Sequence, residues 1–295
     1  MNKKPIFVIG SISIDNTLFT KALPTAGTTT IADQYFCNVG GKGINQACAA
    51  HFLGANVSFF GAIGKDKNGE IVVEFIAKQG LNAKFLESDQ PTGVAFIILE
   101  ESTAENRILI VQGANNCISI NDVKSNEKMF QKDGIFLTQF ENNQQETEFA
   151  IKFAKEKGMT VVVNPAPIKP FSDEYFAYID YIIPNEHELE SLTGEQDPEL
   201  GARKLLAKGV KNVIVTLGEK GSLFANDKQV IKQNPYKVKA IDTTAAGDSF
   251  IGAFVSKLSE NADIKQCLDF ASKASSIAVT RKGAIVSLPK LKEVK

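Results

Sequence analysis

Short runs of apolar residues recur along the chain and alternate with segments whose apolar positions repeat at helical spacing. Uninterrupted apolar runs of this kind are typical of strands buried on both faces of a sheet. Strands are predicted at residues 6–9, 57–60, 135–137, 159–163, 181–183 and 213–217. Amphipathic helices are predicted between them, with glycine stop signals at Gly54, Gly80, Gly158 and Gly209. Such alternation predicts a parallel sheet covered by helices on both faces.

Two stretches depart from this alternation. Residues 11–38 are rich in Thr and Gly and have no helical period, while residues 93–100 and 107–111 predict a strand pair joined by a polar turn at 101–106. We expect a small β element that covers a ligand. It is inserted from about 12–40 and 91–112 into a single domain that spans residues 1–295. An ordinary edge hairpin is the alternative.

The composition and charge of the chain indicate which kinds of partner it binds. A chain of 295 residues with 43% hydrophobic residues fits one α/β structure with a large core. The formal net charge of −1, without a long block of Lys and Arg, argues against nucleic acid and anionic membranes as partners. No apolar run has the length of a signal peptide or a membrane span, so we expect a cytoplasmic protein that binds small molecules. Two histidines leave little material for His-based metal sites or Ser-His-Asp catalysis.

The segment 240–250 places small residues and one carboxylate where a loop turns into an apolar-periodic helix. The unpaired N–H groups of a first helical turn attract phosphate, and Ala and Gly allow it to come close. Asp248, among those donors, would accept the proton of a hydroxyl that attacks the phosphate. This pattern indicates phosphoryl transfer to an alcohol. The alternative is that Asp248 only caps the helix.

Glycines also precede the helix predicted before Gly54. The segment is not a Walker A loop, because Lys42 is followed by Gly43 instead of Ser or Thr, and it lacks the last glycine of a dinucleotide fingerprint. Asn45, one turn into the helix, presents an amide donor and acceptor to a polyol. A structural glycine turn is the alternative. Asp15 follows the first predicted strand, where open α/β sheets bind ligands, and is either a diol acceptor or a plain turn residue.

Two further polar segments follow predicted core strands. Asn185 and Glu188 come after residues 181–183 and offer the oxygen ligands that Mg²⁺ prefers near phosphates. The same pair also fits a helix capping box, and the two interpretations are compatible. Thr216 and Gly218 end the strand at 213–217 and would border a nucleotide. A simple hairpin turn into residues 222–225 is the competing interpretation, and both can hold.

Taken together, these motifs resemble the ribokinase-like (PfkB) carbohydrate kinases over nearly the whole chain. The segments that match the family in order are 40–46, 164–167, 184–188, 242–248 and 278–284. The resemblance implies an α/β fold: a three-layer α/β/α sandwich with a mainly parallel central sheet and a small β-sheet lid. It implies ATP-dependent phosphorylation of the 5-hydroxyl of D-ribose, giving ribose 5-phosphate and ADP. A kinase of 2-deoxyribose, a nucleoside or another sugar is the nearest alternative, and a non-catalytic sugar or nucleotide sensor is a further one.

The resemblance also implies roles for individual residues. Asp248 is the base that takes the proton of the sugar hydroxyl, and the backbone N–H groups of the residues before it bind the transferring phosphoryl group, namely Ala245, Ala246 and Gly247. The implied sugar-binding residues are Ser13, Asp15, Gly41, Lys42, Asn45, Glu141 and Asp248. The implied ATP-binding residues are Asn185, Thr216, Gly218, Gly221, Gly247 and Ser272.

Two cations and a partner subunit are implied in the same way. Glu188 would hold magnesium through water. An activating potassium ion would be bound at the positions Asp242, Thr244, Ala278, Arg281, Gly283 and Ser287, several of them through backbone carbonyls. Family members usually pair their lids across a two-fold axis, so a homodimer through the β lid is expected.

Two positions depart from the family pattern. Ser13 stands where the family usually has an asparagine that contacts the sugar, so a long donor is replaced by a short hydroxyl. Losing one such contact is expected to admit 2-deoxyribose or another furanose. Ser272 replaces the His or Asn often found beside the adenine, which is expected to affect ATP affinity more than chemistry.

Overall fold

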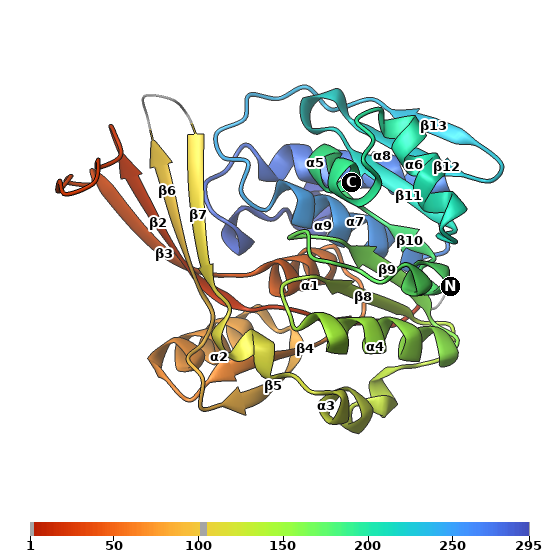
Figure 1. Ribbon diagram of the computed structural model, residues 1–295, viewed down its shortest axis with the longest axis horizontal. Coiled ribbons are helices and arrows are strands. Elements are labelled where there is room, and N and C mark those ends of the chain that lie inside the picture. The colour runs from red at the N-terminus through yellow and green to blue at the C-terminus, as the bar shows by residue number, and fades with distance from the viewer. Residues whose placement is uncertain (1–2, 101–104, 295) are drawn as a thin grey trace.

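The computed structural model describes residues 3–100 and 105–294, and its centre is a nine-stranded sheet between two layers of helices (Figure 1). The strands lie in the order β13-β12-β11-β10-β9-β8-β1-β4-β5. Seven of them pair in parallel: β1 (Ile6–Ile9), β4 (Val57–Gly64), β5 (Asn82–Ser88), β8 (Ile135–Gln139), β9 (Thr160–Asn164), β10 (Tyr181–Ile182) and β11 (Asn212–Thr216). The edge strands β12 (Ser222–Asn226) and β13 (Val230–Gln233) are antiparallel.

Alternate side chains of each buried strand enter one of two apolar cores, as in β1, where Ile6 and Val8 face one core and Phe7 and Ile9 the other. The first core is covered by α1 (Lys42–Phe52), α2 (Lys67–Gln79), α7 (Ala246–Ser259), α8 (Ile264–Ala278) and α9 (Leu291–Val294). The second is covered by α3 (Ile120–Ser125), α4 (Gln144–Glu156), α5 (Glu186–Thr193) and α6 (Pro198–Ala207). The predicted three-layer, mainly parallel α/β fold is confirmed.

Short 3₁₀ turns complete the described part of the chain: η1 (Gly113–Cys117), η2 (Glu127–Met129), η3 (Asp173–Tyr178), η4 (Gly218–Lys220) and η5 (Ile285–Ser287). The glycine stop signal at Gly80 is confirmed, because this residue ends α2 in the left-handed conformation, with φ of 71°. Within the described ranges, no helix combines the length and apolar character needed to cross a lipid bilayer.

A second sheet of four strands projects from the body, at the left of Figure 1, and is called the small sheet. Its strands, in the order β3-β2-β6-β7, are β3 (Gln34–Gly40), β2 (Ser13–Thr20), β6 (Val94–Glu100) and β7 (Glu105–Val111). The edge-hairpin alternative is wrong, since these strands form a sheet of their own. Of the turn predicted at 101–106, residues 101–104 lie outside the described residues, and the last two belong to β7 instead.

The direction in which strands are added reverses next to β1. From β1 the chain adds β4 and β5 on one side of the sheet, whereas β8, β9, β10 and β11 are added on the other. In an open α/β sheet the ligand crevice lies beyond the carboxyl ends of the strands at such a switch point. The residues that follow β1, β8, β9, β10 and β11 therefore define the region of the site.

Candidate active site

Asp248 is the third residue of α7 and points toward α1. Its Oδ2 accepts a hydrogen bond of 2.9 Å from Asn45 Nδ2, and its Oδ1 accepts one of 2.9 Å from Gln46 Nε2. The residue is only 7% exposed. Among the described residues it caps no backbone N–H of α7, so the interpretation of Asp248 as a helix cap is wrong, although it does lie in the first turn of the helix as an acid.

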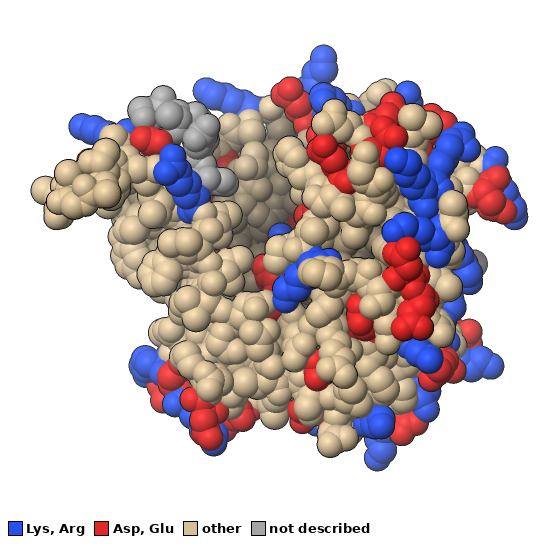
Figure 2. Space-filling model, in the orientation of Figure 1, with Lys and Arg blue, Asp and Glu red and all other residues tan. Residues whose placement is uncertain are grey.

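A cavity of about 200 Å³ lies at the first turn of α7. It brings together predicted site residues from separate parts of the sequence: Lys42, Asn185, Glu188, Thr216, Ala245, Ala246, Gly247 and Asp248. Asn164, Ala166, Ile183, Thr243 and Ile251 complete its lining. A Cβ placed on Gly247 would meet no heavy atom of the described chain within 4 Å, so this turn is open. Figure 2 shows the surface hollowed between the small sheet and the body.

The glycines around Lys42 fit α1 against the chain that leaves β1. A Cβ on Gly43 would overlap the backbone nitrogen of Ser11, and a Cβ on Gly40 would overlap the carboxylate of Asp15. Gly41 has φ of 105°, a conformation that strains other residues. The structural glycine turn is confirmed. Its consequence is that the start of α1 and the start of β2 lie in direct contact.

Glu141, at the end of β8, supplies the cap that α1 lacks in its own sequence. Its Oε2 accepts hydrogen bonds from the backbone N–H of Lys42, at 3.0 Å, and from the hydroxyl of Ser11. The N–H of Gly43 donates to Ser11 Oγ over 3.2 Å. The first N–H groups of α1 are therefore taken by the protein itself. Glu141 has a clear anchoring role, and its contact with a sugar stays a prediction.

Asp15 lies on β2 of the small sheet, so the interpretation of it as a plain turn residue is wrong. It is buried, and Ser13 Oγ donates a hydrogen bond to its Oδ1 over 2.6 Å. Burial raises the pKa of Asp15 to about 6; the Ser13 hydrogen bond opposes this shift, and the negative charges of Glu141 and Asp248 add to it. The small sheet therefore delivers a carboxyl group to the switch point of the central sheet.

Lys42 is a cation surrounded by acids at the start of α1. Burial lowers the pKa of Lys42, but the charges of Asp248, Glu141, Glu188 and Asp15 more than offset this, and the net shift is upward. Lys42 therefore stays protonated. A charged lysine that lines the cavity is suited to binding phosphate.

Asn185 and Thr216 lie side by side at the ends of β10 and β11. Asn185 Oδ1 accepts from the N–H of Glu188 over 2.8 Å, and Glu188 Oε2 accepts from the N–H of Asn185 over 2.8 Å. The capping box is therefore confirmed. Burial raises the pKa of Glu188, against the effect of the backbone hydrogen bond from Asn185. Whether this pair also serves a magnesium ion stays a prediction.

The hairpin interpretation of the segment after Thr216 is confirmed, because β11 and β12 pair in antiparallel fashion across η4. Gly221 is required by this hairpin: its φ is 94°, and a Cβ there would overlap the carbonyl oxygen of Gln233. Gly218 has open space at its Cβ position in the described structure. Ser272 is buried on α8. Within the described chain the three lie outside the 200 Å³ cavity, and their contacts with ATP stay predictions.

Asp242 joins two of the segments expected to bind potassium. Its Oδ1 accepts from the N–H of Thr244 over 2.8 Å, and its Oδ2 accepts from the N–H of Gly283 over 2.8 Å. The loop before α7 is thereby fixed against the loop after α8. Thr243, which lies between Asp242 and Thr244, lines the 200 Å³ cavity. The contact between the two loops therefore borders the candidate site.

The other expected potassium ligands lie on the same C-terminal segment. Arg281 turns its guanidinium to Glu293, which leaves only its carbonyl for a cation at this loop. Ser287 donates its hydroxyl to the carbonyl of Ala284 over 2.8 Å, and Ala278 is buried at the end of α8. Within the ranges that the structure describes, no three His, Cys, Asp or Glu side chains cluster as a metal site. A potassium site here would therefore depend on carbonyl oxygens.

Several buried polar residues that lie beside Asp248 were not predicted from the sequence. Gln46 contacts it directly, and Gln139 and Asn164 contact Gln46. Gln139 and Asn164 are the last residues of β8 and β9, and both are almost fully buried. For Gln139 and Asn164 the sequence did hold a signal: each is a polar amide that directly ends an apolar run. This position places the side chain at the carboxyl ends of the parallel strands, where ligands bind.

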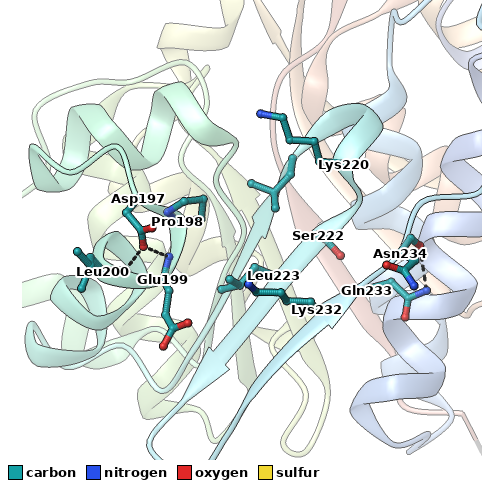
Figure 3. Close-up of a pocket in the computed structure, with 11 residues that line it drawn as sticks. Asp197, Pro198, Glu199, Leu200, Lys220, Ser222, Leu223, Lys232, Gln233 and Asn234 are labelled. Atoms are coloured by element: carbon teal, nitrogen blue, oxygen red, sulfur yellow. Dashed lines mark hydrogen bonds between the residues drawn. The ribbon is translucent and has the colours of Figure 1, made fainter.

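A larger cavity, of about 470 Å³, lies away from this constellation, between the start of α6 and the β12–β13 hairpin (Figure 3). Asp197 lies at its wall and already accepts from the N–H groups of Glu199 and Leu200, which leaves the start of α6 without those donors (Figure 3). In the part of the chain that the structure describes, none of the predicted site residues lines it. The smaller cavity is therefore the one that gathers the predicted site residues.

A buried carboxylate beside the open first turn of a helix, beyond parallel strands, is an arrangement suited to an enzyme that transfers a phosphoryl group to an alcohol. The model of the pfkB family carbohydrate kinases matches residues 3–291, and the chain belongs to that family. A ribokinase of Schizosaccharomyces pombe is 39% identical over 307 residues, covering 98% of this chain and 96% of the relative.

Two further relatives add detail. A deoxyribokinase of Salmonella typhimurium is 33% identical, covering 98% of this chain and 96% of the relative. The structure of Arabidopsis thaliana ribokinase complexed with ribose and ATP matches with a TM-score of 0.88 and 32% identity, covering 99% of this chain and 98% of that one. The chain is therefore a phosphotransferase with an alcohol acceptor, of the ribokinase-like type.

Proposed function

We propose that this chain phosphorylates the 5-hydroxyl of D-ribose with ATP, giving ribose 5-phosphate and ADP. The observation that carries the proposal is the Asp248 carboxylate, which Asn45 and Gln46 hold beside the open first turn of α7. The named activities of the similar proteins, and the ribose and ATP in the Arabidopsis complex, support the choice of substrates.

Sugar recognition is proposed for Asp15, Asn45 and their neighbours Ser13, Gly41, Lys42 and Glu141. Asn45 Oδ1 is buried and has no hydrogen-bond partner among the described residues. A buried acceptor left unpaired is costly, so a ligand hydroxyl that donates to it would bind favourably. Asp15 presents a carboxylate from the small sheet, which would accept from two neighbouring hydroxyls. The small sheet thereby contributes to the sugar site and acts as its lid.

In the proposed transfer step, Asp248 takes the proton of the 5-hydroxyl as that oxygen attacks the γ-phosphorus of ATP. The new bond joins the sugar oxygen to phosphorus, the bond to the β-phosphate oxygen breaks, and ADP leaves with that electron pair. The backbone N–H groups of Ala245, Ala246 and Gly247 face the charge that develops on the phosphoryl oxygens. Asn185, Thr216, Gly218, Gly221 and Ser272 are proposed to border the nucleotide. Catalysis is then mostly positioning and charge stabilisation.

Two cations are part of the proposal. Glu188 lines the cavity next to Asn185, and its carboxylate fits a hydrated Mg²⁺, which supplies charge neutralisation at the phosphates when bound. The junction fixed by Asp242 fits an activating K⁺, because hard oxygen ligands suit such an ion and the flanking segments offer carbonyls. The proposed K⁺ ligands are Asp242, Thr244, Ala278, Arg281, Gly283 and Ser287.

We propose a homodimer that forms through the small sheet, because the outer face of this sheet exposes apolar side chains. The strand pairing places Phe96 beside Asn16 and opposite Leu109, on the face away from Asp15. Tyr35 reaches the same face, where its hydroxyl donates to Asn16 Oδ1 over 2.7 Å. The exposed fractions are 58% for Tyr35, 43% for Phe96 and 67% for Leu109. An apolar face of this kind favours burial against a second copy.

Phosphorylation of 2-deoxyribose is the second candidate, favoured by one observation. Ser13 donates its hydroxyl to Asp15, its own neighbour, over 2.6 Å, and has no amide to offer a sugar. A site with fewer donors discriminates less against a sugar that lacks one hydroxyl. A relative with 33% identity is named deoxyribokinase.

The test of the proposed function is ADP release with a panel of pentoses, hexoses and nucleosides, measured in potassium and in sodium buffers. We expect the highest kcat/KM with ribose, then 2-deoxyribose, and higher turnover in potassium. Turnover of nucleosides but not of free ribose would overturn the substrate assignment. Equal turnover in both buffers would contradict the proposed potassium site.

A further inference from the structure

Gln46 is a fully buried residue of α1 whose side-chain polar atoms are all paired inside the protein. Its Nε2 donates to Asp248 Oδ1 over 2.9 Å and to Asn164 Oδ1 over 3.0 Å. Its Oε1 accepts from Gln139 Nε2 over 2.7 Å. With an exposed fraction of 0%, the side chain is closed off from any ligand in the cavity. Its effect on chemistry must therefore pass through Asp248.

The surrounding amides decide which end of the Gln46 side chain faces Asp248. Gln139 offers a nitrogen, which needs the Gln46 oxygen, whereas Asn164 offers an oxygen, which needs the Gln46 nitrogen. Asn164 is itself held by a 3.0 Å hydrogen bond from its Nδ2 to the backbone carbonyl of Ile183. A reversed Gln46 amide would place its oxygen against the acceptors of Asp248 and Asn164. Asn164, fixed in this way, and the carboxylate of Asp248 thus both require the Gln46 nitrogen, so Gln46 donates to Asp248.

Asn45 holds the other carboxylate oxygen in a different way. Its Nδ2 donates to Asp248 Oδ2 over 2.9 Å, while its Oδ1 is buried and has no partner among the described residues. Under the proposed function, a sugar hydroxyl donates to Asn45 Oδ1, so Asn45 contacts the substrate as well as Asp248. The Gln46 bond to Asp248 Oδ1 involves only protein groups. Gln46 is therefore the contact of Asp248 that acts on the carboxylate alone.

We propose that Gln46 is the positioning residue of the base, supported by Gln139 and Asn164, and that it holds the Asp248 carboxylate in place for the reacting hydroxyl. The inference rests on the proposed role of Asp248. Every side-chain polar atom of Gln46 is paired, and a buried, fully paired amide fixes the geometry of the group it contacts. A misplacement of about 1 Å at a reacting group can lower the rate roughly 100-fold. The expected effect of losing Gln46 is therefore on kcat.

Gln46→Met tests this, because it keeps the length of the side chain and removes the donor. We expect kcat to fall about 100-fold while KM for ATP stays within about twofold. Gln46→Glu retains an acceptor for Gln139 but faces Asp248 with a like charge, so the loss of kcat should be at least as large. The control is Asn126→Leu, which removes another buried amide, one bonded to Asp122 and outside the cavity. Its kcat should not change.

A double-mutant comparison separates positioning from a general effect on packing. In an Asp248→Asn background, adding Gln46→Met should change the residual turnover by less than about twofold, because the carboxylate it positions is gone. The same loss in both backgrounds would overturn the inference, as would wild-type kcat in either folded Gln46 variant. If Asp248→Asn alone keeps wild-type turnover, the proposed base is wrong and the failure lies with the proposed function instead.

Discussion

Asn45 and Asp248 are 203 positions apart in the sequence, yet Nδ2 of the first lies 2.9 Å from Oδ2 of the second. The contact joins the start of α1 to the start of α7, the two helices whose glycine-rich beginnings the sequence singled out. A group proposed to bind sugar thereby touches the group proposed to act as base. Because these two side chains are in direct contact, the motifs at the start of α1 and at the start of α7 belong to one site.

Asp248→Asn is expected to lower kcat by about 10² to 10⁴-fold, the usual contribution of a positioned general base. ATP binding, measured by titration calorimetry, should remain, because the backbone of α7 is unchanged. Asp122→Asn is the control, since Asp122 caps α3 outside the cavity. Near wild-type ADP release by Asp248→Asn would show that another group takes the proton.

Gly247→Ala and Gly252→Ala should have opposite effects on stability, although both lie in α7. Alanine at position 247 meets open space, so the free energy of unfolding should rise by roughly 0.5–1 kcal/mol. Its methyl group enters the cavity, and turnover should fall at least about tenfold because the phosphate is displaced. At Gly252 a Cβ would overlap Ala49, which should destabilise the fold by about 1–3 kcal/mol. Thermal unfolding and ADP release check both; full activity in Gly247→Ala contradicts the proposed phosphate site.

Asp15→Asn should stabilise the fold at neutral pH while it abolishes sugar binding. Burial raises the pKa of Asp15 to about 6, against about 3.9 in an unfolded chain. The folded state therefore binds the proton more tightly, and stability decreases as pH rises from about 4 to about 6. Removing the charge should recover up to about 3 kcal/mol above pH 6 and little near pH 4. Denaturant unfolding at pH 4.5 and 7.5 measures this; an equal effect at both pH values contradicts it.

Ser13→Asn should sharpen the choice between ribose and 2-deoxyribose if position 13 faces the sugar. One added hydrogen bond is worth about 0.5–1.5 kcal/mol, so the ratio of kcat/KM values should rise by about 3- to 10-fold. Ser13→Ala serves as the matched variant, because it removes the hydrogen bond to Asp15 without adding an amide. An unchanged ratio in Ser13→Asn would place position 13 outside the sugar site.

Leu109→Glu should convert the proposed dimer to a monomer, because it places a charge on the outer face of the small sheet, on its edge strand β7. Light scattering coupled to size-exclusion chromatography measures the mass directly. Leu200→Glu is the control: Leu200 is 52% exposed but lies on α6, away from the small sheet. A monomeric wild-type chain, or a Leu109→Glu variant that remains dimeric, rules out this interface.

Most of the central sheet could be predicted from local pattern, since strands buried on both faces are continuous apolar runs. The prediction for β1 matches at both ends, and those for β8, β9 and β11 are correct to within two residues. β5 was not predicted, because it lies at the edge of the sheet and mixes buried and exposed positions. Asp15 was expected after the first strand as part of a loop, but pairing with β3 and β6 makes it part of a strand. That pairing is non-local and leaves no local signal.

The sequence by itself determined the alternation of strands and helices, the glycine-rich helix starts and the presence of Asp248 where phosphate is favoured, because each depends on near neighbours in the chain. Only the tertiary structure decided what Asp248 touches. Gln46, Gln139 and Asn164 come from a helix and two strands, and their amides meet because parallel strands end at one edge of the sheet. Buried polar groups favour hydrogen-bond partners, and the Gln46 amide finds its partners in Asn164, Gln139 and Asp248.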